Sequence, residues 1–526
     1  MKTAPAGLRL PAALLDPACY PHAVGRIRVI ETHISWVFLT GRFAYKVKKP
    51  VDLGFANFSS LRLRRHYCRE ELRLNRRLAG NVYLDVVTLR GDPRRPRIGG
   101  KGPVLEYAVR MRQFRQSALA SRALASGQFG VRQIDALADR IAAFHAGALA
   151  APAGDSCGTS ASALDSALEN FHQMLPLAKS RQDRARLLAL RQWTRREHTL
   201  RGEALEARKS AGAIRECHGD LHLGNIALID GDPVPFDCIE FNDRFRWIDV
   251  MNEVAFLVME LDYRGRGELG WRFLNRYLES TGDYAGISVL RFYLVYRALV
   301  RAKVHLMRSR QRDLARPDRR RLLKAFRAYL RLAHRYSAAP QSALAITHGL
   351  SGSGKSTVTQ SLAERVGAIR LRSDVERKRL HGMTALARSR SEPGGGIYTR
   401  TGTAATYRRL GSLARAILEA GYPAIVDATF LKRTERETFR AIADACSVPF
   451  TILDFRVPLA ALRERVAARS AKNSDASEAG LSVLERQIAV CDPFTPAEMR
   501  ERLPVDGLAP AQQAISVRRW KNKLNI

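Results

Sequence analysis

Residues 349–356 read GLSGSGKS and match the pattern G-x-x-x-x-G-K-[ST] in full. In such a loop the glycines let backbone N–H groups curl round phosphate oxygens, the lysine reaches the β- and γ-phosphates, and the next hydroxyl holds Mg²⁺. An apolar strand-like run, residues 343–347, leads into the loop and an amphipathic helical pattern follows it, which is the context that this mechanism needs. The residues predicted to bind ATP here are Gly349, Ser351, Gly352, Ser353, Gly354, Lys355, Ser356 and Thr357, with Ser356 also a metal ligand.

After this loop, strand-like runs alternate with helical segments, which predicts a parallel sheet covered by helices. Asp374 follows one run and Asp427 ends another, and the carboxyl ends of parallel strands meet at one edge of the sheet. We expect Asp427 to hold Mg²⁺ through water. Asp374 is placed to accept the proton of an acceptor hydroxyl, with Arg377 one helical turn on; a helix N-cap is the alternative role for Asp374. Basic residues on a later helical segment suit either a lid over the transferred phosphoryl group or a solvated helix: Arg463, Arg465, Arg469 and Lys472.

The glycine-rich loop, the S-D-x-x-R segment at 373–377 and the V-D-A stretch at 426–428 together resemble small P-loop kinases of the polynucleotide 5′-hydroxyl kinase and gluconate kinase type. The resemblance covers roughly residues 343–500. The polynucleotide kinase pattern implies Asp374 as general base and Arg377 as a clamp on the phosphate of the acceptor.

A second constellation, HGDLHLGN at residues 218–225, lies in the first half of the chain. Asp220 and Asn225 have the D-x-x-x-x-N spacing of a kinase catalytic loop, in which a carboxylate receives the proton and oxygen ligands hold Mg²⁺. A predicted hairpin follows, with its turn at residues 230–233. Because a hairpin returns its second arm to the level where the first began, we expect Asp237 to lie near Asn225.

This segment closely resembles the aminoglycoside phosphotransferase family, which shares the protein-kinase-like fold. The resemblance covers about residues 20–335 and implies Asp220 as catalytic base, with Asn225 and Asp237 as metal ligands. The nucleotide lysine of the family corresponds to Lys46 on the third strand-like run, although Lys48 alternates onto the same face. Its partner should be a glutamate on the next helix, for which we choose Glu71 over Glu70.

Other parts of the same resemblance are less complete. Residues 111–114 would form the hinge against adenine, and His222 is expected to give structural support. Residues 32–35, Thr-His-Ile-Ser, stand where a G-x-G-x-x-G loop is expected, so the loop that covers the phosphates is not indicated by the sequence.

The two halves predict a two-domain fold. Five strand-like runs and one helical segment (60–79), followed by a larger helical body, indicate an α+β bilobal protein-kinase-like domain over 1–336, with a small lobe at about 22–112 and a large lobe at about 115–336. A small-residue linker at 337–342 leads to an α/β P-loop NTPase domain with a parallel sheet over 343–526. This order of halves resembles a bacterial group described as bifunctional aminoglycoside phosphotransferase/ATP-binding proteins, also known as AAA-family ATPases.

The chain has 526 residues, with 87 Lys and Arg against 51 Asp and Glu, a net charge of +36. This surplus indicates either a face that binds polyanions or the Arg- and Ala-rich composition of a GC-rich coding sequence. The seven cysteines are scattered and form no C-x-x-C pair, which argues against a disulfide framework and a zinc site. With neither a membrane-spanning run nor a convincing secretory h-region, we expect a cytoplasmic protein without a membrane partner.

The leading hypothesis is an ATP-dependent phosphotransferase with two ATP·Mg²⁺ sites that phosphorylates a hydroxyl of a small-molecule acceptor. One alternative is a nucleic-acid 5′-hydroxyl kinase in the P-loop half, with the Arg-rich helical segment at 308–335 gripping the backbone or simply forming a solvated face. Another is a regulatory nucleotide-binding protein with one inactive half. No motif indicates the identity of the acceptor, and no feature indicates an oligomeric state.

Overall fold

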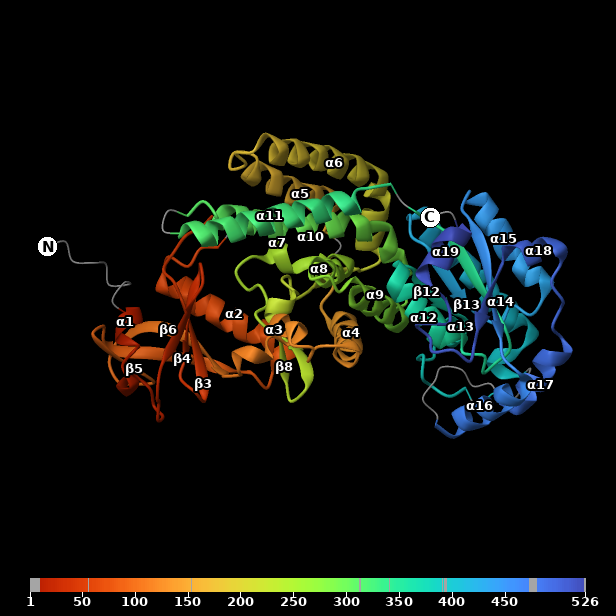
Figure 1. Cartoon of the computed structure of the whole chain (residues 1–526). Helices are drawn as coiled ribbons and strands as arrows, with labels where there is room; N and C mark the ends of the chain where they lie inside the picture. Colours follow the sequence, from red (N-terminus) through yellow and green to blue (C-terminus); the bar gives the residue numbers. More distant parts are fainter. Residues whose placement is uncertain are drawn as a thin grey trace. The chain divides into compact units, whose positions relative to one another are not determined.

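The computed structural model describes residues 10–524 except 55, 153, 312–313, 340, 390, 392–394 and 473–479. The chain forms two compact units, of which the first comprises residues 1–162 and 209–257 and the second residues 163–208 and 258–526. The predicted linker at 337–342 stays a prediction, and Pro340 within it lies outside the described residues. Figure 1 shows the elements of both units.

The first unit is built on a six-stranded antiparallel sheet in the order β1-β2-β3-β6-β4-β5. Its strands are β1 (Arg28–Glu31), β2 (Ser35–Leu39), β3 (Phe43–Lys48), β4 (Tyr83–Asp92), β5 (Arg95–Ile98) and β6 (Val104–Arg112). All five strands expected in the small lobe are present, and β5 was not predicted.

Helix α2 (Leu61–Ala79) begins where the Ser60 side chain accepts a hydrogen bond from the Leu63 N–H, a usual N-cap. It packs on one face of the sheet, where Cys68 and Ala79 meet Val109. Because successive side chains of a strand point to opposite faces, β3 sends Tyr45 to the other face, which has its own apolar core. Lys46 and Lys48 are thereby turned toward α2.

The remaining elements of the first unit are short helices, a hairpin and a two-stranded ladder. They are α1 (Leu10–Ala13), η2 (Pro17–Cys19), η3 (Gln116–Ala118), α3 (Ala120–Ala125), α4 (Val131–Gly147), β7 (Ile214–Glu216), η4 (Leu223–Asn225), β8 (Ile226–Ile229), β9 (Asp232–Pro235), α7 (Asp243–Arg246) and β10 (Trp247–Asp249). The hairpin β8–β9 turns at Asp230 and Gly231, both with positive φ, 54° and 86°. This two-residue Asp-Gly turn is shorter than the predicted one, because Asp232 and Pro233 already belong to the second strand.

Three helices run across the division in the chain: α5 (Ser160–Met174), α6 (Arg181–Ser210) and α8 (Val250–Tyr263). The second unit continues with α9 (Gly267–Thr281), η5 (Tyr284–Gly286), α10 (Ile287–Arg308) and α11 (Arg316–Tyr336). These helices form the helical body that was expected before residue 336.

The rest of the second unit is a five-stranded, wholly parallel sheet in the order β12-β13-β11-β14-β15. Its strands are β11 (Leu344–His348), β12 (Ile369–Arg372), β13 (Ala424–Asp427), β14 (Phe450–Arg456) and β15 (Arg502–Asp506). Its helices are α12 (Lys355–Val366), α13 (Ser373–Leu380), η6 (Gly396–Tyr398), α14 (Arg400–Glu419), α15 (Arg433–Ala445), α16 (Leu459–Lys472), α17 (Leu481–Ala489), α18 (Pro496–Glu501) and α19 (Val517–Leu524). The predicted fold classes, protein-kinase-like α+β and P-loop α/β, are confirmed.

The core of the parallel sheet explains its near-continuous apolar strands. Buried residues of β11, β13 and β14 pack against Val358 and Leu362 of α12 and Trp520 of α19.

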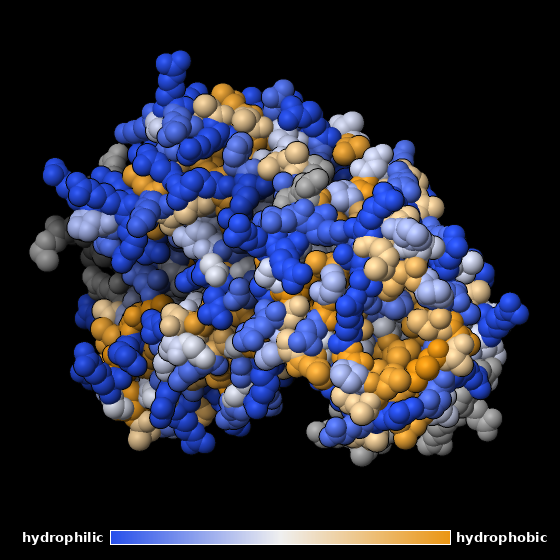
Figure 2. All heavy atoms as spheres, turned by 45° about the vertical axis from the view of Figure 1, so that its right-hand side comes forward, coloured by the Kyte–Doolittle hydropathy of each residue, from blue (hydrophilic) through white to orange (hydrophobic). Residues whose placement is uncertain are grey.

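Among the described residues, no helix combines the length and apolar character that crossing a bilayer requires. On the face shown in Figure 2, hydrophilic side chains predominate over hydrophobic ones.

Candidate functional site

The phosphate loop connects the central strand β11 to helix α12. Gly352 and Gly354 both have φ of +86°, in the left-handed region that favours glycine. A Cβ at Gly352 would also lie 3.0 Å from the Val466 side chain. The glycines of the motif are therefore required both by the turn and by the close packing of α16 against the loop.

Lys355 is the first residue of α12, and its side chain folds back into the phosphate loop. Its Nζ donates 2.8 Å hydrogen bonds to the carbonyl oxygens of Gly349 and Leu350. From α17, Gln487 accepts a 2.8 Å hydrogen bond from the Ser351 N–H. The backbone N–H of a predicted phosphate-binding residue is thus paired with a side chain that no motif identified.

Asp427 is the residue of β13 that reaches the carboxyl edge of the sheet. Its side chain is 4% exposed, and its Oδ2 has no hydrogen-bond partner. Arg372, its register partner at the end of β12, places Nε 3.8 Å from that oxygen. A buried, unbonded carboxylate oxygen beside the Ser356 loop is a hard oxygen donor of the kind that Mg²⁺ prefers, so these two residues fit the predicted metal.

Asp374 and Arg377 both lie on α13, which starts at the edge where β12 ends. The N-cap position of α13 belongs to Arg372, and no side chain caps it, so the alternative role of Asp374 as an N-cap is wrong. Arg377 is 7% exposed and donates to the Ile397 carbonyl at 3.3 Å and to Thr403 Oγ1 at 3.2 Å, while its Nε has no hydrogen-bond partner. Its guanidinium lies 5.1 Å from the centre of the Tyr398 ring.

The predicted lid residues divide into two groups. Arg465 faces the loop and donates a 2.8 Å hydrogen bond to the Gly507 carbonyl, whereas Arg463 is half-exposed and pairs with Glu485 at 2.8 Å. The side chains of Arg469 and Lys472 lie outside the described residues. Arg486, on α17, was not predicted and lines the same cavity as Arg465.

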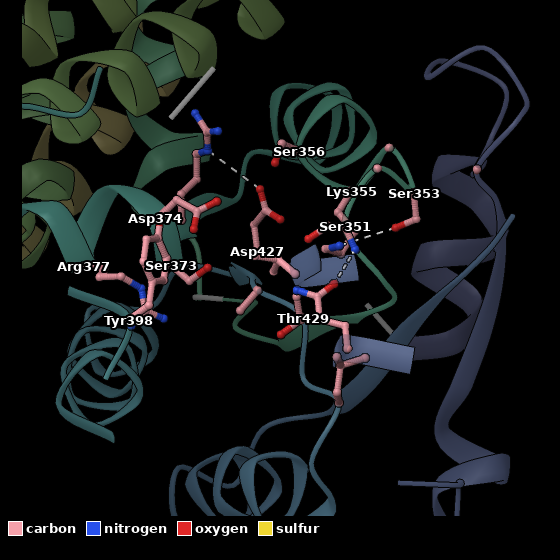
Figure 3. A pocket seen from close by; sticks show the side chains of 18 of the residues that line it. Ser351, Ser353, Lys355, Ser356, Ser373, Asp374, Arg377, Tyr398, Asp427 and Thr429 are labelled. Carbon is pink, nitrogen blue, oxygen red and sulfur yellow. Dashed lines mark hydrogen bonds and ion pairs between the residues drawn. The ribbon is translucent and has the colours of Figure 1, made fainter. Parts of the chain in front are cut away.

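One cavity of about 830 Å³ collects these groups. It is lined by the loop residues 351–358, by Asp427, by Asp374 and Arg377, and by Arg465. In the close view of Figure 3, Asp374 and Arg377 lie at one end, Lys355 at the other, and Asp427 between them. Residues at the ends of three strands, β11, β12 and β13, and Arg465 of α16 thereby surround one space large enough for a nucleotide and a small second molecule.

In the first unit, Lys46 is the centre of a buried charge cluster. Its Nζ donates to Glu71 Oε1 at 2.7 Å and also to Asp237 Oδ1. Burial alone would lower the pKa of Lys46, but Asp237 and Glu71 raise it well above its usual range. The lysine therefore stays charged, as its predicted role at the triphosphate would require.

Lys48 shares the same glutamate on its deeper side. Its Nζ donates to Glu71 Oε2 at 2.7 Å and to Glu240, and its side chain is only 1% exposed. Burial would raise the pKa of Glu71, but Lys46 and Lys48 hold it at about 2. The choice of Glu71 over Glu70 agrees with these contacts, since Glu70 pairs instead with Arg73.

The predicted catalytic loop places Asp220 and Asn225 in contact. Asn225 Nδ2 donates to Asp220 Oδ2 at 2.9 Å, so the amide oxygen is the Asn225 side-chain atom that is left for a cation. The hairpin returns as expected, because Phe236 N–H donates to the Asn225 carbonyl at 2.9 Å and Asp237 follows directly with φ of +66°. An amide oxygen and two carboxylates fit Mg²⁺, and the roles of these residues stay predictions.

Several supporting residues of this loop were not found from the sequence. Glu253 accepts from the Gly219 N–H at 2.6 Å and from His145 at 2.9 Å, with Cys217 close by. Both carboxylate oxygens of Glu253 are thus engaged, which indicates a support for the loop backbone. Asn75 accepts from the Cys238 N–H at 2.9 Å, and the Tyr83 hydroxyl accepts from the Asp237 N–H at 3.2 Å.

The connection of β1 to β2 is a tight turn. Thr32 Oγ1 accepts hydrogen bonds from the N–H groups of Ser35, at 2.9 Å, and Ile34, at 3.3 Å. Its side chain forms the turn at the position where the sequence lacks the expected G-x-G-x-x-G pattern.

A family model and several solved structures match parts of the chain. The family model described as "AAA domain" matches residues 344–494. Among solved structures, a gluconokinase from Sinorhizobium meliloti 1021 is 20% identical and covers 36% of this chain and 94% of its own, with a TM-score of 0.26. The amicoumacin kinase hAmiN, in complex with AMP-PNP, Ca²⁺ and Ami, is 13% identical and covers 61% of this chain and 91% of its own, with a TM-score of 0.36.

Relatives from mycobacteria match most of the chain. The protein named "Uncharacterized protein Rv2004c" from Mycobacterium tuberculosis strain H37Rv is 32% identical over 477 residues, which are 88% of this chain and 91% of that protein. A protein of Mycobacterium bovis, "Uncharacterized protein Mb2027c", matches to the same extent. The chain therefore belongs to the family of these mycobacterial proteins.

Proposed function

We propose that the chain is an ATP-dependent phosphotransferase with two ATP·Mg²⁺ sites, which transfers phosphoryl groups to a hydroxyl of a small-molecule acceptor. The observation that carries the proposal is the cavity of the second unit, where the phosphate loop and the unbonded Asp427 oxygen share one space with Asp374. Phosphoryl transfer needs little covalent chemistry from the protein and depends on positioning and charge stabilisation, which this set of groups can supply.

In this cavity each group has a distinct task. Ser356 and Asp427 would hold Mg²⁺, which when bound neutralises charge on the phosphates. Asp374 takes the proton of the acceptor hydroxyl at its carboxylate. Lys355 would leave the loop carbonyls to contact the transferred phosphoryl group, and Arg465 lies on the lid side of the same space.

Arg377 defines the class of acceptor that this cavity would select. Arg377 lines the cavity, the residue is 7% exposed and its Nε has no hydrogen-bond partner, so its guanidinium is a cation that an anionic group of a ligand would pair with. We infer that the acceptor carries an anionic group, a carboxylate or a phosphate, close to the hydroxyl that is phosphorylated. The cavity volume of about 830 Å³ favours a small acceptor over a polymer.

In the first unit, Asp220 is the base that we propose. Asn225 Nδ2 fixes one of its carboxylate oxygens at 2.9 Å, and the side chain is partly exposed. Asn225 and Asp237 would hold Mg²⁺, which when bound bridges and neutralises the phosphates. Lys46 would bind the phosphate oxygens, held in place by Glu71.

The test measures ATP consumption by the full chain against a panel of hydroxyl acceptors, with and without anionic groups, and short single-stranded oligonucleotides. We expect turnover with small acceptors, and we expect Asp220→Ala and Lys355→Ala each to remove one part of it and the double variant to remove all. Asp444→Asn, an exposed acid paired with Arg440 on α15, is the control and should match the wild type. Turnover with oligonucleotides alone would favour the nucleic-acid alternative. Full activity in the double variant would refute the proposal.

A further inference from the structure

Helix α9 covers the edge strand of the parallel sheet, although it precedes the predicted linker by more than fifty residues. Asn275 of α9 donates from Nδ2 to the Ala368 carbonyl at 2.9 Å and accepts at Oδ1 from the Arg370 N–H at 2.7 Å. These two bonds satisfy backbone groups at the start of β12. Figure 1 shows α9 beside α12 and β12, within the second unit.

One turn further along α9, Glu279 is buried between two arginines of β12. Its Oε1 accepts from Arg370 Nη2 at 2.7 Å and from Arg370 Nε at 3.1 Å. Its Oε2 lies 3.7 Å from Arg372 Nη1. A single carboxylate of α9 therefore holds both cations of the strand.

Each of these arginines also contacts a residue of the proposed metal site. Arg370 Nη1 donates to the Ser356 carbonyl at 2.6 Å, and Arg372 Nε lies 3.8 Å from the unbonded Asp427 Oδ2. Arg372 is thus shared between Glu279 and Asp427.

We propose that Glu279 is a positioning residue of the P-loop site, which sets the affinity for Mg²⁺ by drawing Arg372 away from Asp427. The inference rests on the proposed function of the cavity. Without the Glu279 charge, Arg372 would pair fully with Asp427 and the cluster would gain one net positive charge. Both effects oppose a divalent cation at Asp427.

The test measures nucleotide binding by the full chain, by calorimetry, over a series of Mg²⁺ concentrations and without acceptor. Glu279→Gln keeps the shape of the side chain and removes its charge, and we expect the Mg²⁺ concentration for half-maximal binding to rise about tenfold. Glu364→Gln is the matched control. It breaks a 2.7 Å ion pair with Arg272 between α9 and α12 but contacts neither Arg372 nor Asp427, so its Mg²⁺ dependence should match the wild type.

A double-variant cycle separates this role from a merely structural one. Arg372→Ala should lower the Mg²⁺ concentration needed, and Glu279→Gln should add no further rise in that background, because the effect acts through Arg372. If Glu279→Gln does not fold, Arg372→Ala alone decides, since an unchanged or weaker Mg²⁺ response would overturn the inference. Wild-type protein that binds no ATP would refute the proposed function itself. Wild-type binding together with an unchanged Glu279→Gln variant would refute only this inference.

Discussion

Lys46 and Glu71 are joined by a 2.7 Å salt bridge, and Lys48 occupies the other oxygen of the same carboxylate at 2.7 Å. The glutamate is fully buried, so its charge is tolerated only because both cations compensate it. This arrangement ties α2 to β3 and holds Lys46 beside Asp237. It also makes the stability of the first unit depend on the charge of one residue.

We expect Glu71→Gln to lower the free energy of unfolding by about 2 to 3 kcal/mol at pH 7, because it removes one of the two carboxylates that each of the two buried lysines contacts. The pKa of Glu71 is lowered from 4.5 to about 2 in the folded protein, so its stabilising effect is fully present above pH 4.5 and is lost as the pH falls toward 2. Urea unfolding of both proteins between pH 7 and pH 3.5 measures this. A difference that grows as the pH falls would contradict the assignment.

Replacing Lys46 and Lys48 one at a time should separate ATP binding from the stability of the fold. Lys46 contacts Asp237, whose side chain is 41% exposed, whereas Lys48 contacts only buried acids. In a Lys355→Ala background, which silences the second site, Lys46→Met should weaken ATP binding at least about tenfold. Lys48→Met should chiefly lower the melting temperature. If Lys48→Met abolishes binding in protein that is still folded, the nucleotide lysine is Lys48.

Asp374→Asn tests the proton acceptor of the P-loop site. The substitution keeps the shape of the side chain and removes its basicity, so kcat should fall by about 10² to 10⁴ while ATP binding stays unchanged. Product formation in a Asp220→Ala background, with initial rates over a range of ATP concentrations, gives both quantities. Equal kcat in the variant would exclude Asp374 as the base and leave it a structural residue of α13.

Two of the strands that the sequence did not predict, β5 and β15, share one feature. Strand β5 contains Pro96 and β15 contains Pro504, and a proline within an apolar run argues against a strand. Both are edge strands, where a missing N–H is tolerated. The presence of proline therefore explains both why the sequence did not predict these strands and why they lie at the edges.

The predicted residues of the phosphate loop and of the catalytic loop come from contiguous motifs, in which a loop brings its own side chains together. The supporting residues do not. Gln487 and Glu279 reach the site from helices more than fifty residues away from the motif, and nothing in their local sequence marks them. Likewise, the alternation of side chains along β3 puts Lys46 and Lys48 on one face. Only the three-dimensional structure shows that Lys46 is the more exposed of the two and Lys48 the more deeply buried.

Arg377→Ala should act on the acceptor and leave the nucleotide unaffected. Its guanidinium lies between Tyr398 and Thr403, on α13 and away from the phosphate loop. We expect the KM for an anionic acceptor to rise about 30- to 100-fold, as for the loss of a charge-assisted hydrogen bond, with the KM for ATP within twofold. An acceptor analogue without the anionic group should be used equally well by both proteins. A matching rise in the KM for ATP would place Arg377 at the nucleotide instead.

Arg465 and Arg463 lie two residues apart on α16. Replacing each in turn tests the predicted lid role of Arg465 against a matched control. Arg465 lines the cavity and donates to the Gly507 carbonyl, while Arg463 pairs with Glu485 outside it. A cation that stabilises the transferred phosphoryl group acts mainly in the transition state, so Arg465→Ala should lower kcat by about 10² or more with little change in ATP affinity. Arg463→Ala removes the same charge from the same helix but only a half-exposed ion pair, and we expect less than a twofold change. Equal losses of kcat in the two variants would mean that the charge of α16 as a whole acts on the site, and that neither arginine reaches the phosphoryl group.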